Sequence, residues 1–137
     1  MAGEQMPTAK EGQLSMSEDT DWDDVRALFA RVEAGEALTL TPDVRELLLR
    51  TAQQVAIPEA AAHSAIQDVE AATALLGEVR VRIRTGSQRM MLTLPAARRL
   101  RLAGNKAGAR KLLEDLLAVE VVPLYREQAE LALEDLD

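Results

Sequence analysis

Apolar residues recur every three or four positions over most of the chain after residue 18, and this spacing predicts helices with one buried face. The first group is Trp22, Val25, Leu28, Phe29 and Val32. Thr20 or Asp21 can cap the first turn of this helix, and Gly35 suits the position after its last turn. Residues 1–18 are polar and show no period, so we expect them to form a disordered tail.

Prolines divide the next segment into two further predicted helices. Thr41 is a capping residue and Pro42 suits a first helical turn, so the second helix should start there. It should end near Ile57, because the residue before Pro58 is disfavoured in helical geometry. A short third helix is expected from Pro58 to about Ile66, with an alanine face that allows close packing. That face is Ala60, Ala61, Ala62 and Ala65.

The segment after Asp68, a residue that can cap a helix, predicts one long helix. Residues 79–84 alternate apolar and basic side chains, which is the period of a strand, but a lone strand would leave its backbone groups unpaired. We therefore expect a helix from Val69 to about Thr93, weakened at Gly86. Pro95 should kink it or start a new turn.

The C-terminal third predicts two helices joined to the long one by short connections. Ala103-Gly104-Asn105 should form a tight turn, and an amphipathic helix should follow from Lys106 to about Val119. Pro123 should break that helix, with a last helix from about Leu124. A helix, a glycine turn, a second helix and a following proline resemble one tetratricopeptide repeat, but no 34-residue period runs through the chain. A plain helical hairpin that completes a small core is the alternative interpretation.

These elements predict an all-α fold, a compact bundle of about six helices with one long central helix and a tetratricopeptide-like C-terminal hairpin. Residues 19–137 should form a single helical domain. Its parts are N-terminal helices (19–67), the long helix with a kink near Pro95 (68–103) and C-terminal helices (104–137). Apolar residues make up 47% of the chain and aromatic residues 2%, so the core must be aliphatic, which favours helices over sheets.

The residue types needed for most catalytic and metal sites are scarce. The chain has no cysteine, which excludes disulfides, thiolate nucleophiles and cysteine-ligated zinc, and His63 is its one histidine. The acidic run at residues 19–24 lacks the glycine and glutamate of a calcium loop, and residues 104–108 lack the spacing of a phosphate loop. We expect no catalytic residue, no cofactor, no metal site and no enzymatic activity.

Charge is arranged in three blocks, acidic, basic and acidic, within a net charge of -7. Residues 78–111 carry ten basic residues and one acidic residue, Glu78. This basic segment either pairs with the acidic helices of the same chain or binds an acidic protein partner. Its candidate binding residues are Arg80, Arg84, Arg89, Arg98 and Arg101.

Other partners fit the sequence less well. No aromatic residue lies between Phe29 and Tyr125, which counts against nucleic acid as a partner. No apolar run approaches the length of a membrane span and the N-terminus lacks the pattern of a secretory signal, so we expect a cytoplasmic protein with no membrane partner. The apolar run of Met90, Met91, Leu92 and Leu94 leaves a homodimer contact open as an alternative to burial within the monomer.

Three motifs resemble those of a known family. They are the D-W-x-x-V-R-x-L start at residue 21, the A-G-N-x-x-G-A-R turn at residue 103 and V-E-V-V-P-L-Y-R-E-Q-A-E from residue 119. Together they resemble the DUSAM domain, a myxobacterial paralogous family of unknown function, over about residues 21–136. The resemblance supports these boundaries and implies no catalytic residues.

Our functional hypothesis from the sequence is a non-enzymatic cytosolic adaptor or regulator that acts through protein–protein contacts. The alternative is an immunity protein or antitoxin whose acidic faces neutralise a basic toxin by charge complementarity.

Overall fold

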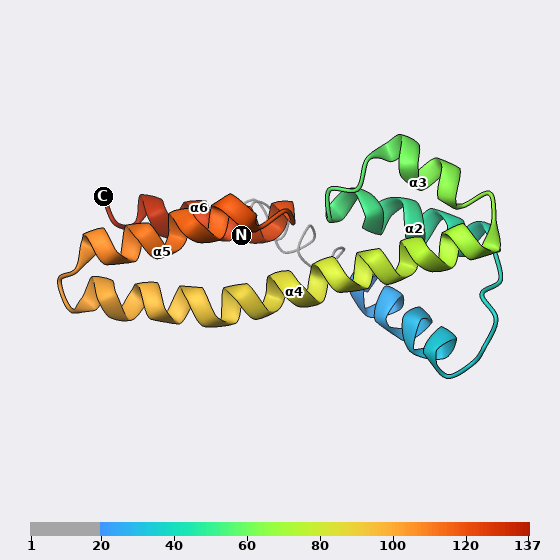
Figure 1. Ribbon diagram of the computed structural model, residues 1–137, viewed down its shortest axis with the longest axis horizontal. Helices are drawn as coiled ribbons and strands as arrows, with labels where there is room; N and C mark the ends of the chain where they lie inside the picture. The colour runs from blue at the N-terminus through green and yellow to red at the C-terminus, as the bar shows by residue number, and fades with distance from the viewer. Residues whose placement is uncertain (1–19) are drawn as a thin grey trace, which may run out of the picture. The chain divides into compact units, whose positions relative to one another are not determined.

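Six helices and no strand make up residues 20–137, the part of the chain that the computed structural model describes. The all-α prediction is confirmed, and the tail expected at residues 1–18 lies outside the described residues. The helices are residues 20–33, α2 (Pro42–Gln54), α3 (Glu59–Ala65), α4 (Val69–Leu102), α5 (Lys106–Val119) and α6 (Pro123–Glu134), as Figure 1 shows.

Contacts between residues divide the chain into two compact units. Unit 1 runs to Gln53 and resumes over Ile57–Arg80, and unit 2 consists of Gln54–Ala56 and Val81–Asp137. Helix α4 contributes to both units, because the division falls between Arg80 and Val81. The expected single domain over residues 19–137 stays a prediction.

The core of unit 1 is mainly aliphatic, and Trp22 and Thr51 are buried in it as well. Its buried aliphatic side chains include Val25, Leu28, Leu48, Ala52, Ile66, Ala72, Leu76 and Val79. Arg50 of α2 donates from Nε and Nη2 to the two carboxylate oxygens of Asp21, both at 3.2 Å. The guanidinium of Arg80 lies 5.6 Å from the centroid of the Phe29 ring. These contacts join the first helix to α2 and to the start of α4.

Helix α2 starts where the sequence predicted but ends earlier. The Thr41 hydroxyl accepts the Val44 N–H at 3.2 Å, which is the expected cap. The helix ends at Gln54, so the end expected near Ile57 is wrong. Ala56 takes a left-handed conformation with φ +64°, and the Ile57 N–H turns back to the Ala52 carbonyl at 2.9 Å. The chain therefore leaves the helix before the restriction imposed by Pro58 takes effect.

The alanine face predicted for the third helix is mostly exposed. Of the four alanines expected to pack closely, the structure buries Ala62, leaves Ala65 half-buried and exposes Ala60 and Ala61. A helix of seven residues has few positions that face the same neighbouring element. The four alanines are spread too widely around this helix to be buried together. That prediction is wrong.

Helix α4 is continuous over 34 residues, and residues 79–84 within it are helical. Asp68 accepts the Ala71 N–H at 2.9 Å, which confirms the predicted cap. The end expected near Thr93 is wrong, because the helix passes through Gly86 and Pro95 to Leu102. Pro95 removes a hydrogen bond to the carbonyl of residue 91, on the exposed side of the helix, where water can replace it. The kink near Pro95 stays a prediction.

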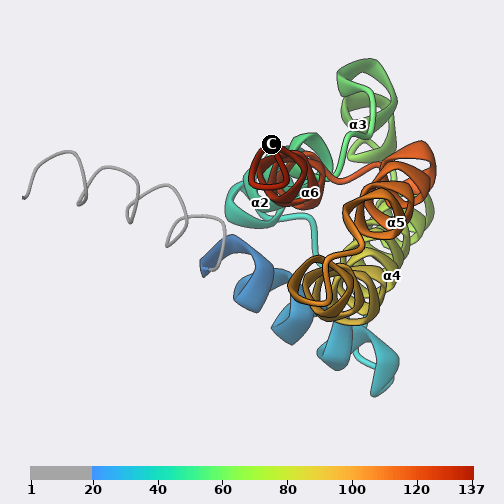
Figure 2. The same cartoon turned by 90° about the vertical axis from the view of Figure 1, so that its left-hand side faces the viewer.

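Unit 2 places the second part of α4, α5 and α6 side by side (Figures 1 and 2). The turn into α5 is as expected: Gly104 has φ +85°, the Asn105 N–H donates to Leu100, and the Asn105 side chain caps α5 through Gly108. The buried core of unit 2 consists of Val55, Ile83, Met90, Ala97, Ala109, Leu113, Leu116, Val122, Tyr125, Ala129 and Leu136.

The break predicted at Pro123 is misplaced. Helix α5 ends at Val119, three extended residues follow, and Pro123 is the first residue of α6. Proline is favoured in that first position because its missing N–H has no helical partner there. What ends α5 is therefore the conformation of Glu120, with ψ 131°, rather than the proline.

Replacing Ala56 with glycine should stabilise the protein. A non-glycine residue in the left-handed region costs about 1–2 kcal/mol. Glycine avoids this strain, but it loses more conformational entropy on folding, so the net gain is smaller than the strain. We expect A56G to raise the free energy of unfolding by about 0.5–1 kcal/mol, measured by urea denaturation. The matched control A74G, at an exposed site in α4, should lower it by about 1 kcal/mol. If A56G destabilises the protein as much as A74G, the left-handed conformation at Ala56 is wrong.

Candidate functional site

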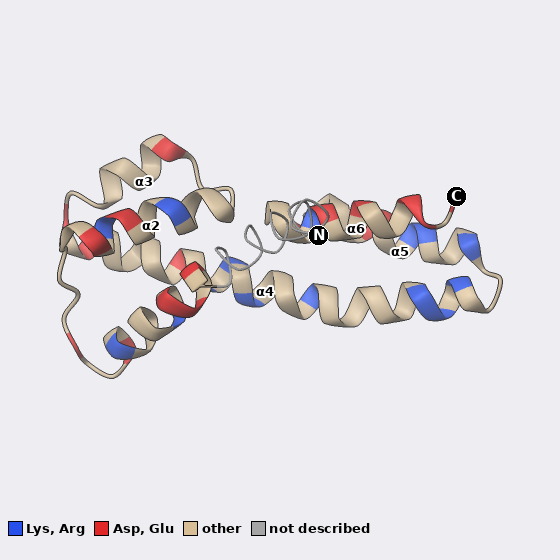
Figure 3. Cartoon of the chain, turned by 180° about the vertical axis from the view of Figure 1, so that it is seen from behind, with Lys and Arg blue, Asp and Glu red and all other residues tan. Residues whose placement is uncertain are grey.

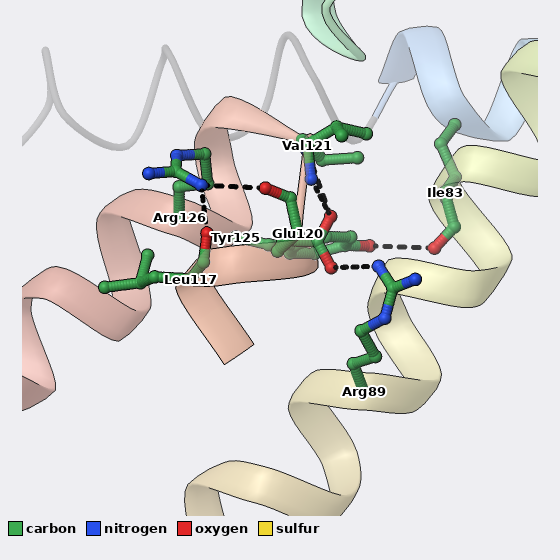
Figure 4. Close-up of polar contacts among 8 residues, drawn as sticks. Ile83, Arg89, Leu117, Glu120, Val121, Tyr125 and Arg126 are labelled. Atoms are coloured by element: carbon green, nitrogen blue, oxygen red, sulfur yellow. Dashed lines mark hydrogen bonds and ion pairs between the residues drawn. The ribbon is translucent and has the colours of Figure 1, made fainter. Parts of the chain in front are cut away.

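The side chain of Glu120 is completely buried in unit 2, at the connection between α5 and α6 (Figure 4). Its Oε1 accepts a hydrogen bond from Nη1 of Arg89, on α4, at 3.2 Å. Its Oε2 accepts the backbone N–H groups of Val121 and Val122 at 3.1 and 3.0 Å. A buried carboxylate is costly unless both oxygens have partners, and here both do.

Tyr125 and Gly86 bring α6 and α4 into close approach beside this carboxylate. The Tyr125 hydroxyl donates to the carbonyl of Ile83 at 3.4 Å (Figure 4). A Cβ at Gly86 would lie 2.5 Å from Cδ2 of Tyr125 and 2.8 Å from Oε2 of Glu120. Only a residue without a side chain therefore leaves room for the tyrosine ring and the carboxylate against α4.

Arg126 binds backbone carbonyls at the end of α5, next to the connection between α5 and α6. Its Nη1 donates to the carbonyls of Leu117 at 2.6 Å and Glu120 at 2.8 Å (Figure 4). The last carbonyls of a helix lack partners within the helix, and a nearby arginine can bind them. We refer to Gly86, Arg89, Glu120, Tyr125 and Arg126 as the Glu120 cluster.

The chemistry of the Glu120 cluster is that of a structural junction. Its carboxylate oxygens, its tyrosine hydroxyl and Arg126 all bind backbone or side-chain groups of unit 2. The cluster thus joins three helices through polar contacts around a fully buried carboxylate.

Sequence reasoning missed this cluster, although a signal was present. Glu120 stands alone in the apolar run from Leu116 to Val122, and Gly86 interrupts the long predicted helix. An acidic residue in an apolar run and a glycine inside a helix each call for a tertiary partner. The partners are 31 residues apart in the chain for Arg89 and Glu120, so spacing along the sequence could not pair them.

The five arginines proposed from the sequence do not form one site. Arg80 lies over Phe29 in unit 1, and Arg89 belongs to the Glu120 cluster. Arg84, Arg98 and Arg101 are exposed, and within residues 20–137 their side chains make no hydrogen bond or ion pair. Some arginines of the basic segment therefore contact groups within the chain and others face solvent, and binding of a partner by this segment stays a prediction.

The solvent side of α4 in unit 2 carries an apolar stripe among arginines. Helical spacing places eight exposed residues within one face, which we call the α4 outer face. They are Val81, Arg84, Gln88, Met91, Leu92, Pro95, Arg99 and Leu102. Met91, Leu92 and Leu102 are 72%, 76% and 73% exposed, and none of the eight residues is acidic. Figure 3 shows the arginines along α4 in blue and the acidic residues of α6 in red.

Arg98 and Arg101 are the two predicted residues that the structure brings together. They line a shallow groove of about 280 Å³ at the end of unit 2, with Asp135 and apolar side chains of α4, α5 and α6. Of the apolar run at residues 90–94, Met90 is buried and Leu94 half-buried, so the exposed part is Met91 and Leu92.

Residues 20–137 lack the features of two other kinds of site. No group of three or more histidine, cysteine, aspartate or glutamate side chains in residues 20–137 could hold a metal ion. In the same residues, no helix combines the length and apolar character needed to cross a membrane. His63 is exposed beside Glu59, with 3.5 Å between Nε2 and Oε1.

Adding one methyl group at Gly86 should destabilise the protein, although alanine is the better helix former. The new Cβ would overlap Tyr125 and Glu120, and overpacking of this kind costs about 1–3 kcal/mol. We expect G86A to lower the free energy of unfolding by about 2 kcal/mol. G77A is the matched control in the same helix, where a Cβ meets nothing within 4 Å, and it should raise stability by about 0.8 kcal/mol. Equal effects of the two variants in urea denaturation would contradict the close approach at Gly86.

A double-mutant cycle should show strong coupling between Arg89 and Glu120. R89M leaves the fully buried carboxylate of Glu120 without its charge partner, and E120Q does the same to the partly exposed guanidinium of Arg89, while the double variant removes both charges. We expect a coupling free energy of about 1–2 kcal/mol from urea denaturation. The exposed pair Lys111–Asp115 is the control, with a coupling below about 0.5 kcal/mol. Additive effects at Arg89 and Glu120 would rule out the buried pair.

Comparison with known proteins places nearly the whole described chain in one family. Residues 20–136 match the family described as "Protein of unknown function (DUF2379)". No curated protein and no solved structure matches the chain. The matched segment begins with the first helix and ends after α6, so it covers the described part of unit 1, unit 2 up to residue 136 and the complete Glu120 cluster. The chain belongs to this family of unknown function.

Proposed function

We propose that this protein is a non-enzymatic protein–protein interaction module, an adaptor or regulator, and that the α4 outer face is its binding surface. The observation that carries the proposal is the exposure of Met91, Leu92 and Leu102, which are all more than 70% exposed on one face of one helix. Large apolar side chains scattered singly are ordinary, but several of them on one face of one helix are typical of an interaction surface.

The charges around the stripe define the chemistry of the partner. Arg84 and Arg99 flank Met91 and Leu92 along the helix, and no acidic residue lies on this face. An amphipathic helix with apolar residues between acidic ones would bury the stripe and pair with the arginines. The partner is therefore a protein that presents an acidic amphipathic helix.

Three finer features belong to the same proposal. The end of α4, the turn at Gly104 and α5 form a tetratricopeptide-like hairpin, supported by the left-handed glycine and by the buried small residue Ala109. The DUSAM domain is the family name that the motifs at residues 21, 103 and 119 support. A cytoplasmic location agrees with a chain that has no cysteine.

Photocross-linking in the native cell tests the proposal. A photoreactive phenylalanine analogue in place of Leu92 should form an adduct with a second protein chain, and mass spectrometry should map the adduct to an acidic helical segment. The double variant R84E/R99E in the same background should reduce the yield at least fivefold, because the charges at both ends of the stripe then repel the partner.

The matched control carries the photoreactive residue at Ala74, which is exposed on the same helix but in unit 1. It should give none of the adducts seen from position 92. Identical adducts from both positions, or a yield from position 92 that R84E/R99E leaves unchanged, would contradict the assignment of the α4 outer face.

The second candidate function, an immunity protein or antitoxin, is supported by the opposite face of unit 2. Glu127, Glu130 and Glu134 are exposed at helical spacing along α6 and could bind a basic toxin. If that is the function, deleting the gene should make the cell sensitive to a toxin encoded beside it. Unchanged survival on exposure to that toxin would rule it out.

A further inference from the structure

Unit 2 carries two exposed helical faces of opposite charge and similar pattern. On the α4 outer face, Met91 and Leu92 lie between Arg84 and Arg99. On α6, the exposed residues Glu127, Glu130, Leu131 and Glu134 form what we call the α6 outer face. Leu131 is 52% exposed and lies between Glu127 and Glu134, so each face has an apolar centre with charges at both ends.

We propose that the α4 outer face of one molecule binds the α6 outer face of a second copy of the same chain. This inference rests on the proposed function and names the acidic amphipathic helix that the proposal requires. Within residues 20–137, the side chains of Arg84, Arg99, Glu127 and Glu134 make no ion pair, so their charges are available to a neighbouring molecule.

Charge decides which faces meet. If two α4 outer faces met around a central two-fold axis at Met91 and Leu92, Arg84 would lie close to Arg99 of the other copy, and like charges would repel. Two α6 outer faces would oppose glutamates in the same way. Only the pairing of α4 with α6 covers apolar residues on both sides and places opposite charges together.

The charges are spaced more widely on α4 than on α6, and the reach of the arginine side chains covers the difference. At 1.5 Å per residue, Arg84 and Arg99 are about 22 Å apart along α4, and Glu127 and Glu134 are about 10 Å apart along α6. Arginine side chains are long and flexible enough to lean inward over the apolar centre and reach the carboxylates. The contact is small, so we expect weak association that decreases as salt screens the ion pairs.

The geometry of unit 2 predicts an open assembly. Helices α4 and α6 both turn buried residues, such as Ile83 and Ala129, toward the core of unit 2, so their outer faces point away from it. A contact between two different faces of the same molecule repeats head to tail unless the rotation closes it. The average mass in light scattering should therefore rise with concentration, and it should fall again in high salt.

A charge swap tests this contact directly. R84E/R99E makes both faces acidic, and E127K/E134K gives both faces a net positive charge although Glu130 remains, so neither variant should associate with itself. Mixing the two restores opposite charges at both contacts, and the mixture should associate at least tenfold more strongly than either variant alone in sedimentation or light scattering. Circular dichroism should show unchanged helix content in both variants, because all four residues are exposed.

The control for general electrostatic attraction moves the lysines to unit 1 of a chain whose α4 outer face is already acidic. R84E/R99E/E33K/E46K adds the same charge change at exposed sites of the first helix and α2. Mixed with R84E/R99E, it should show no increase in mass, because neither variant then has a basic outer face. An equal increase with this control, or no increase with E127K/E134K, would overturn the inference.

The failure of this inference is distinguishable from the failure of the proposed function. If the wild-type protein stays monomeric at all concentrations while position 92 still cross-links to a different acidic protein in the cell, self-association is wrong and the interaction module stands. If position 92 gives no specific adduct of any kind in the cell, the proposed function is wrong as well.

Discussion

A carboxylate removed from water inside unit 2 has to be matched by partners on both oxygens, and the placement of three helices follows from that requirement. Arg89 reaches Glu120 from α4, and the N–H groups of Val121 and Val122 can reach it only if α5 stops at Val119. Since Glu120 also turns the chain into α6, one ionised side chain determines where α5 ends and which side of α4 is covered.

The same cluster explains the contrast between the two sides of α4. The side that meets Tyr125 and Glu120 carries Gly86, while the opposite side carries the exposed residues of the α4 outer face. The leucine and methionine side chains of this face are exposed to water among arginines, which is unfavourable in free energy. Exposed apolar patches of this kind are ordinarily buried by a binding partner. Internal packing and the proposed binding surface therefore lie on opposite sides of a single helix.

Local signals predicted most of the elements, because caps and turns depend on neighbouring residues. Thr41, Asp68 and Gly104 each have the roles that their types predicted, and the alternating residues 79–84 proved helical. Two helix ends were predicted wrongly. Helix α2 ends early because Ala56 adopts a left-handed turn that favours glycine, and α4 continues through Pro95, which lies on its solvent-exposed side. Local signals could not separate the arginines either. Nothing near Arg89 in the sequence distinguishes it from Arg84, although Arg89 contacts Glu120 and Arg84 is exposed.

Gly86 also has a consequence for how this family can vary. In a relative whose residue 86 carries a Cβ, the ring at position 125 would meet that atom at about the distance found for the built Cβ, 2.5 Å. Such a relative would need a smaller residue at position 125 or a shift of α6, so the two positions should change together during evolution. An alignment of family members could then show covariation between positions 39 residues apart, and it would identify α4 and α6 as neighbours without any structure.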